Sequence, residues 1–168
     1  NHEILRRLLT DDIQEHRFKT YLIPITNRSG FHMDFAELHK SLPFNTIQDY
    51  ENYLSQLSQF GVYTDQHIDV LKTGIQQDYV LPEVVLQGYE DTIRPHIVAD
   101  PTKSLVFTPF LTWPADIALE DRKLLSDRAA MTIEQGVVPA YKRFLEFMVK
   151  EYIPASRSTI AASALPNG

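Results

Sequence analysis

The sequence predicts an all-α protein, a bundle of about six helices with a long, proline-kinked C-terminal helix and two irregular loops that contain aromatic residues and proline. Three observations predict this class. Apolar residues recur every three or four positions over most of the chain, which is the helical period. Of the 168 residues, 43% are hydrophobic and 23% charged, an ordinary balance for a soluble globular domain. Residues that break helices gather mainly in two stretches, 21–30 and 100–116.

The first helix is expected over residues 1–18. Its apolar residues share one face and its charged residues take the other, and the apolar set is Ile4, Leu5, Leu8, Leu9 and Ile13. The helical pattern stops near Lys19. An irregular loop follows over 21–30, because Pro24 favours an extended residue before it and the end of the stretch is rich in turn formers such as Gly30.

Four shorter helices are expected in the middle of the chain. Asn, Thr and Asp are favoured N-caps, and proline is tolerated in the first helical position because the amide there has no helical partner. The expected extents are 34–41, ended by Pro43; a helix capped by Asn45 or Thr46 that stops at a break near Phe60 and Gly61; a helix capped by Thr64 or Asp65 that reaches Tyr79; and a helix that starts at Pro82 and ends near Ile97.

The second irregular stretch, 100–116, holds three prolines and three large aromatic side chains, Phe107, Phe110 and Trp113. Because such rings carry much apolar surface, we expect this stretch to lie across the helices and bury them.

One long helix is expected from Ala118 to about Tyr152, ended by Pro154. Pro139 lies inside it and lacks a backbone donor, which predicts a kink there. We interpret 1–168 as a single helical domain that is a fragment of a larger protein, with residues 155–168 as a tail at the junction to a missing C-terminal half.

Composition excludes several classes of function. The net charge of −6 and the scattered basic residues argue against a nucleic-acid surface. The absence of cysteine excludes disulfides, thiolate nucleophiles and thiolate metal sites. No apolar run approaches the ~18 residues that a membrane span needs.

No catalytic motif stands out. None of the six histidines has a second histidine one helical turn away, as helical zinc sites require, so we interpret them as surface or loop residues. No Gly-x-Ser-x-Gly elbow or glycine-rich phosphate loop is present. Helix faces carry Tyr50, Tyr53, Tyr141 and Tyr152. These tyrosines suit the edge of the core or, as the alternative, the lining of a cleft.

Three blocks of residues, taken together, resemble one family. They are 27–32 with 42–44 and 49–54; 139–141 with 144–145 and 151–154; and 157–168, which ends in Leu-Pro-Asn-Gly. Their order and spacing resemble the bacterial family catalogued as domain of unknown function 885, and the resemblance covers nearly the whole chain. Members of that family look like helical zinc metallopeptidases and include exported proteins and lipoproteins.

The resemblance implies that the chemistry lies outside this segment. The family's His-Glu-x-x-x-Gly-His-type helix follows the Leu-Pro-x-Gly block, so zinc and the general base are expected beyond Gly168. This segment is then a non-catalytic wall of the substrate cleft, without metal or cofactor, in a periplasmic or cell-envelope protein. The implied partners are the C-terminal half of the same chain and a peptide substrate of the parent, which a lipid could anchor. No nucleic acid and no membrane contact by this segment is expected.

The matched blocks supply four candidates for substrate binding. Arg28 and His32 lie in a loop, where functional side chains are common, and Tyr152 and Arg157 lie near the junction with the absent half. An arginine can pair with a substrate carboxylate through two hydrogen bonds. The alternative for each is structural, for example capping a helix end.

Two rival functions stay open. In one, the parent has lost its chemistry and serves as a binding or scaffolding lipoprotein. In the other, the segment is a free-standing helical interaction module.

Overall fold

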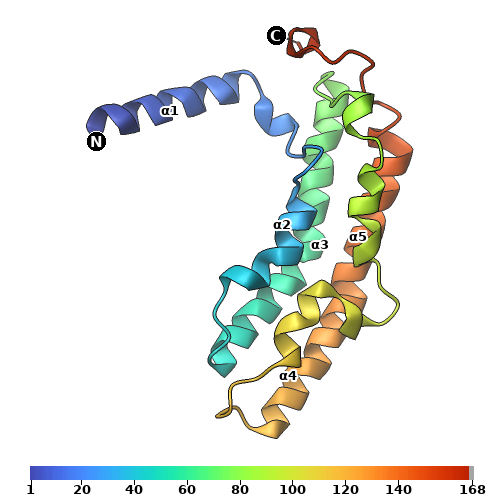
Figure 1. Ribbon diagram of the computed structural model, residues 1–168. Coiled ribbons are helices and arrows are strands. Elements are labelled where there is room, and N and C mark those ends of the chain that lie inside the picture. The colour runs from blue at the N-terminus through green and yellow to red at the C-terminus, as the bar shows by residue number, and fades with distance from the viewer. Residues whose placement is uncertain (167–168) are drawn as a thin grey trace.

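The computed structural model describes residues 1–166, which form helices and turns without a β-sheet (Figure 1). The α-helices of this part of the chain are α1 His2–Arg17, α2 Phe31–Glu37, α3 Ile47–Gln76, α4 Leu119–Thr132 and α5 Val138–Phe147. Two π-helical turns, η8 Ile133–Val137 and η9 Met148–Tyr152, follow α4 and α5. The all-α prediction is confirmed.

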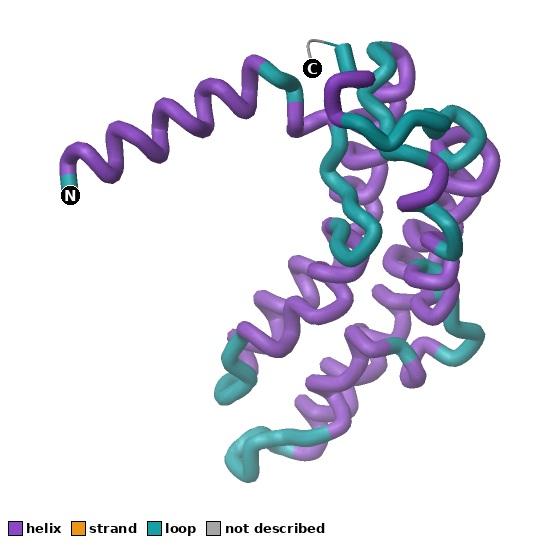
Figure 2. Tube along the Cα trace, turned by 45° about the horizontal axis from the view of Figure 1, so that its top comes forward, coloured by secondary structure: helices purple, strands orange, loops and turns teal. Residues whose placement is uncertain are grey.

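Two long helical rods form the body of the molecule. One is α3, and the other is the continuous unit of α4, η8, α5 and η9, which packs along α3. The shorter α2 lies against α3, and 3-10 segments from the middle of the chain cover the rods (Figure 1). In both views α1 extends away from this body (Figure 2).

Helix α3 begins at a capping box. The Thr46 hydroxyl accepts a hydrogen bond from the Asp49 amide, and the Asp49 carboxylate accepts one from the Thr46 amide at 2.8 Å. A cap of this kind contributes about 1 kcal/mol. The expected break near Phe60 and Gly61 is wrong, because α3 continues to Gln76. One glycine costs a helix only about 1 kcal/mol, and the buried face on both sides of Gly61 outweighs that.

The long C-terminal helix is distorted where Pro139 lies, as expected. The distortion takes the form of the π turn η8 directly before α5, in whose first turn Pro139 is placed. The wider π spacing lets the helix pass a residue that has no amide to donate. A second π turn, η9, leads into the end of the helix near Pro154.

The helix expected from Pro82 to Ile97 is wrong in type. The segment forms three 3-10 turns instead, Glu83–Val85, Tyr89–Thr92 and Arg94–His96. Gly88, directly before the second turn, has a left-handed φ of 73°, a conformation that interrupts an α-helix. Pro95 lies in the third turn, where its missing amide would interrupt an α-helix.

The second irregular stretch packs as predicted. It forms the 3-10 segments η6 Pro101–Lys103 and η7 Leu105–Leu111, in which Phe107 and Phe110 are buried. The Trp113 ring stacks on Tyr50, with 4.3 Å between ring centroids. The Tyr53 hydroxyl donates to the Val106 carbonyl at 3.0 Å, which fixes this stretch to α3.

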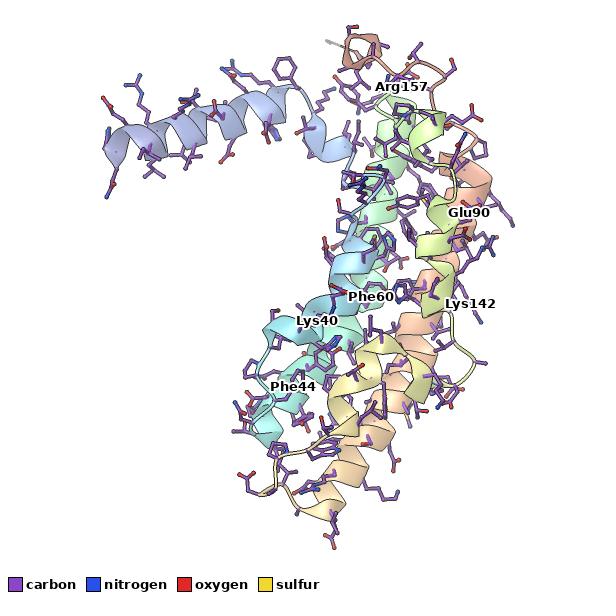
Figure 3. The ribbon with its side chains drawn as sticks, viewed as in Figure 1. Lys40, Phe44, Phe60, Glu90, Lys142 and Arg157 are labelled. Atoms are coloured by element: carbon purple, nitrogen blue, oxygen red, sulfur yellow. The ribbon has the colours of Figure 1, made fainter. Side chains whose placement is uncertain are left out.

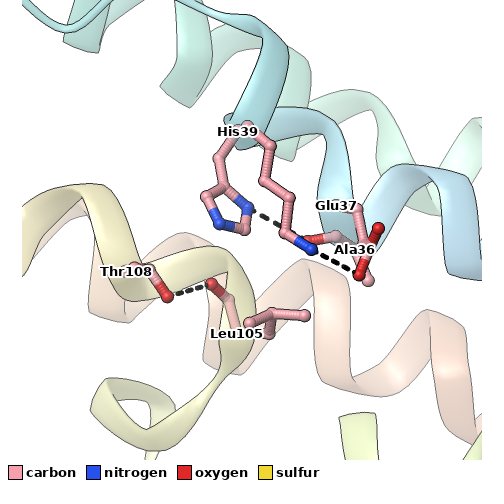
Figure 4. A network of polar contacts seen from close by, with 6 residues as sticks. Ala36, Glu37, His39, Leu105 and Thr108 are labelled. Atoms are coloured by element: carbon pink, nitrogen blue, oxygen red, sulfur yellow. Dashed lines mark hydrogen bonds and ion pairs between the residues drawn. The ribbon is translucent and has the colours of Figure 1, made fainter.

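Residues 31–41 form a helix in two parts. The expected helix over 34–41 is confirmed as helical but starts earlier, as α2, and continues as the 3-10 turn η2 Leu38–Ser41. Figure 4 shows the junction, where His39 Nδ1 donates to the Ala36 carbonyl at 3.2 Å and Lys40 pairs with Glu37. Segment η7, with the Thr108 to Leu105 hydrogen bond, faces this junction.

The core lies between α3 and the C-terminal rod. All four tyrosines of the sequence prediction are buried in it and less than 2% exposed: Tyr50, Tyr53, Tyr141 and Tyr152. Burial in the core, not exposure in a cleft, is therefore their position in this structure.

Helix α1 contributes nothing to that core. None of its residues is buried, and the five aliphatic side chains of its apolar face are each more than half exposed: Ile4, Leu5, Leu8, Leu9 and Ile13. These five residues are called the α1 stripe below. No helix among residues 1–166 combines the length and apolar content that a bilayer span requires.

Candidate functional site

An apolar groove lies between α2 and α3. Its volume is about 420 Å³, in the range of small-ligand and peptide sites. It is called the α2–α3 groove and is lined by Asp34, Phe35, Leu38, Ser55, Gln56, Gln59, Phe60 and Tyr63. The first three come from α2 and η2, and the others from one side of α3.

The floor of the groove is aromatic. The Phe35 ring stacks on Phe60 with 4.0 Å between centroids. Phe60 lies on α3 (Figure 3) and is completely buried. Phe35 and Leu38 keep part of their surface exposed. Tyr63, which is 41% exposed, also lines the groove, and its ring lies edge-on to Phe31. The floor can therefore take an apolar side chain by removing its surface from water.

The rim of the groove is polar and carries little charge. Ser55, Gln56 and Gln59 are exposed on α3, and their side chains make no hydrogen bond within the described residues. Asp34 is the charged residue of the lining, and no cation of residues 1–166 pairs with its carboxylate. The rim thus offers amide donors and acceptors together with one negative charge.

His32 lies behind the groove, on the inner face of α2. Its side chain has no exposed surface, so the expectation of a surface or loop histidine is wrong for this residue. Its Nε2 lies 2.9 Å from the Thr92 hydroxyl, which donates its one hydrogen to the Tyr89 carbonyl. Nε2 therefore carries the proton and donates, and Nδ1 is left as an acceptor without a partner in the described residues.

Burial controls the charge of His32. Desolvation, with a smaller contribution from His96, lowers the pKa of His32 from 6.5 to about 4. The backbone of the same residue is also anchored, because the Tyr141 hydroxyl on α5 donates to the His32 carbonyl at 2.7 Å. His32 thus joins α2 to the C-terminal rod and fixes one wall of the groove.

Arg28 is exposed in the tight turn before α2. The turn is held by the Thr26 hydroxyl, which accepts from the amides of Arg28 and Ser29. The Arg28 guanidinium has no ion-pair partner in residues 1–166, so its charge is available to a ligand.

Tyr152 and Arg157 both bind the segment that follows α3. The Tyr152 hydroxyl accepts from the Leu81 amide at 3.3 Å, and burial raises the pKa of Tyr152 to about 12. The Arg157 guanidinium donates to the carbonyls of Val80, Thr159 and Ala161 at 2.6 to 3.0 Å (Figure 3). Tyr152 thus joins the segment after α3 to the C-terminal rod, and Arg157 joins the same segment to the tail.

The four predicted residues do not form one site in this structure. Arg28 lies in the turn before α2, His32 in α2, Tyr152 in η9 and Arg157 in the tail, and none of them lines the α2–α3 groove. A substrate-binding role for Arg28, His32, Tyr152 or Arg157 stays a prediction.

Two bidentate ion pairs hold α3 against the C-terminal rod. Arg128 on α4 binds both carboxylate oxygens of Glu51, with Nη2 to Oε2 at 2.7 Å. Arg143 on α5 binds Asp65 at 3.0 and 3.2 Å. Two parallel hydrogen bonds fix the orientation of the two side chains as well as attracting them to each other. The ion pairs therefore help to hold α3, which carries the groove floor, in a defined position.

Sequence reasoning missed the lining of the groove. The expected break at Phe60 and Gly61 assigned Gln56 and Tyr63 to different helices, so their shared face on α3 was not seen. The available signal was the spacing of Gln56, Gln59 and Tyr63, which puts all three on one side of an unbroken helix.

The donor set does not fit a metal ion. Among residues 1–166, no group of three or more His, Asp or Glu side chains is arranged to hold one. The zinc that the resemblance implies for the parent therefore has no site on the described residues.

The comparisons with known proteins give a family and no closer relative. No curated protein and no solved structure matches the chain. The family described as bacterial protein of unknown function (DUF885) matches residues 1–168. This match spans the whole sequence, and the chain belongs to the DUF885 family of bacterial proteins.

Proposed function

We propose that this helical segment forms a non-catalytic wall of the substrate cleft in a larger protein that resembles zinc metallopeptidases. The observation that carries the proposal is the α2–α3 groove. Its aromatic floor and amide-rich rim suit a peptide, which offers an apolar side chain and backbone hydrogen-bonding groups at the same time.

The catalytic groups and the zinc ion belong, in this proposal, to the C-terminal half of the longer chain. The α1 stripe supports a second surface between the two halves, because five neighbouring aliphatic side chains are exposed on a helix that has no buried residue in the described part of the chain. Apolar patches of this kind mark contact surfaces in other proteins. Of the four predicted residues, the exposed Arg28 would contact the substrate directly. His32, Tyr152 and Arg157 would support the binding surface from behind, because the first two are buried and Arg157 binds backbone carbonyls.

The proposal places the parent in the periplasm or cell envelope as an exported lipoprotein, by analogy with the family resemblance. The alternative is a binding or scaffolding lipoprotein without enzymatic activity. The groove fits either function, because in both it binds a peptide and takes no part in a chemical step.

The test uses the full-length product. Zinc content is measured by elemental analysis, and hydrolysis is measured on a set of short peptides. The double variant Gln56→Ala and Gln59→Ala should raise KM by about tenfold and leave kcat unchanged, because it removes binding that substrate and transition state share. Gln66→Ala on the same helix is the matched control, since Gln66 is exposed and lies outside the groove.

The outcomes separate the two functions. Stoichiometric zinc, peptide hydrolysis and a KM effect confined to the double variant support the cleft wall. Peptide binding without zinc or hydrolysis supports the scaffolding alternative. Unchanged KM in the double variant of an active enzyme would contradict the assignment of this groove to the cleft.

A further inference from the structure

We propose that the α2–α3 groove binds an extended peptide segment in which an apolar side chain is followed or preceded by a lysine or arginine. The inference rests on the proposed function and adds the chemistry of the peptide. The apolar side chain rests on Phe35, which the buried Phe60 ring supports from below. The peptide backbone meets Gln56 and Gln59, and the basic side chain pairs with Asp34.

The floor selects a large apolar side chain. Phe35 and Phe60 stack at 4.0 Å, and Leu38 and Tyr63 complete an apolar lining in a hollow of about 420 Å³. A flat aromatic or branched aliphatic group covers such a surface, whereas alanine leaves most of it in water.

The rim selects an extended backbone. Gln56 and Gln59 are three residues apart on α3, so their Cβ atoms lie about 5–6 Å apart on one face. Alternate residues of an extended chain are about 6.6 Å apart along the strand. Each free glutamine amide offers both donors and an acceptor, which matches the paired carbonyl and N–H of a peptide unit.

The charge of the groove selects a cation beside the apolar side chain. Asp34 is the charged residue of the lining, and within residues 1–166 its carboxylate has no cationic partner. The other carboxylate of α2, Glu37, is already paired with Lys40 at 2.6 Å. The whole chain carries a net charge of −6, which also favours approach of a basic peptide over an acidic one.

The groove is formed before any ligand arrives. The wall that carries Asp34 and Phe35 is anchored through His32 to Thr92 and to Tyr141, and the wall that carries the glutamines is one continuous helix. A preformed groove avoids the ordering cost that weakens flexible sites.

The experiment measures binding of four fluorescein-labelled hexapeptides to the full-length protein, with a chelator present so that hydrolysis does not interfere. The peptides are identical except for a central Phe-Arg, Phe-Glu, Ala-Arg or Ala-Glu pair. We expect Phe-Arg to bind about three- to fivefold more tightly than Phe-Glu, as for an exposed ion pair, and more tightly than Ala-Arg. The advantage of arginine should shrink as salt rises.

Three variants make the assignment specific. Asp34→Asn should remove the preference for arginine, and Asp34→Lys should invert it. Glu134→Gln is the control, because Glu134 is an exposed carboxylate outside the groove and should leave the preference unchanged. Circular dichroism verifies that each variant is folded.

The possible failures are distinguishable. Equal binding of the Phe-Arg and Phe-Glu peptides, or a preference that survives in Asp34→Asn, overturns the inference and leaves a peptide-binding wall in place. Binding of none of the four peptides overturns the proposed function and the inference together.

Discussion

His32 makes the stability of the fold depend on pH in the range where an ordinary histidine titrates. Its pKa is 6.5 in the unfolded chain and about 4 in the folded one, because burial disfavours the charged imidazolium. Between these two values the unfolded state binds a proton that the folded state does not. The free energy of unfolding therefore falls as pH is lowered from 6.5 to 4, and His32 contributes its full stability only above pH 6.5.

The size of the effect follows from the shift. A difference of 2.5 units corresponds to about 3 kcal/mol in total, at 1.36 kcal/mol per unit. Near pH 5.3 almost one proton separates the two states, so the slope due to His32 is about 1.2 kcal/mol per pH unit. Burial also lowers the pKa of His67 and of His96, which adds to the same trend.

The contribution of His32 is measured by comparing the pH dependence of the free energy of unfolding between the wild type and two histidine variants. Urea unfolding followed by circular dichroism gives the free energy of unfolding between pH 4.5 and 6.5 for the wild type, for His32→Asn and for His2→Asn. The last is the control, since His2 is exposed on α1. We expect the slope to drop by about 1 kcal/mol per pH unit in His32→Asn alone. If His32→Asn and the wild type have the same slope, His32 is not buried as a neutral side chain and the reasoning is refuted.

Three further substitutions test the packing. Phe60→Ala removes the buried ring beneath the groove and should lower the free energy of unfolding by about 3–5 kcal/mol in chemical denaturation. Tyr141→Phe removes the hydrogen bond to the His32 carbonyl and should cost about 1 kcal/mol in the same assay. Arg157→Ala should release the tail without unfolding the body, so that exchange of the Glu83 amide, which donates to the Arg157 carbonyl, rises at least about tenfold by hydrogen-exchange mass spectrometry.

The helices of this fold were predictable because their signal is local. The spacing of apolar residues lies within each helix. The N-cap at Thr46 and the stop at Pro154 lie at the helix ends that they predict. Local signals also caused the two main errors. Gly61 marks a helix end only when no long buried face continues through it, and the same spacing of apolar residues between Pro82 and Ile97 fits an α-helix or a series of 3-10 turns.

The candidate site was not predictable because it depends on contacts between distant parts of the chain. His32 meets Thr92, 60 residues away, and Tyr141, 109 residues away. Nothing near His32 in the sequence indicates these partners, and without them it has the pattern of a loop histidine. The groove likewise needs α2 against α3, which only tertiary packing supplies.

The α1 stripe is an apolar helix face that the described residues do not cover. Its apolar spacing is as regular as that of α3, yet all of its side chains are exposed, whereas α3 buries one face in the core. Apolar periodicity indicates that one face of a helix can be buried. It does not indicate which other segment buries that face. The α2–α3 groove is fixed by buried hydrogen bonds within the described residues and can bind a ligand as it stands. The α1 stripe has no such support within residues 1–166, and in the proposed function the groove therefore binds the ligand and α1 takes part in assembly.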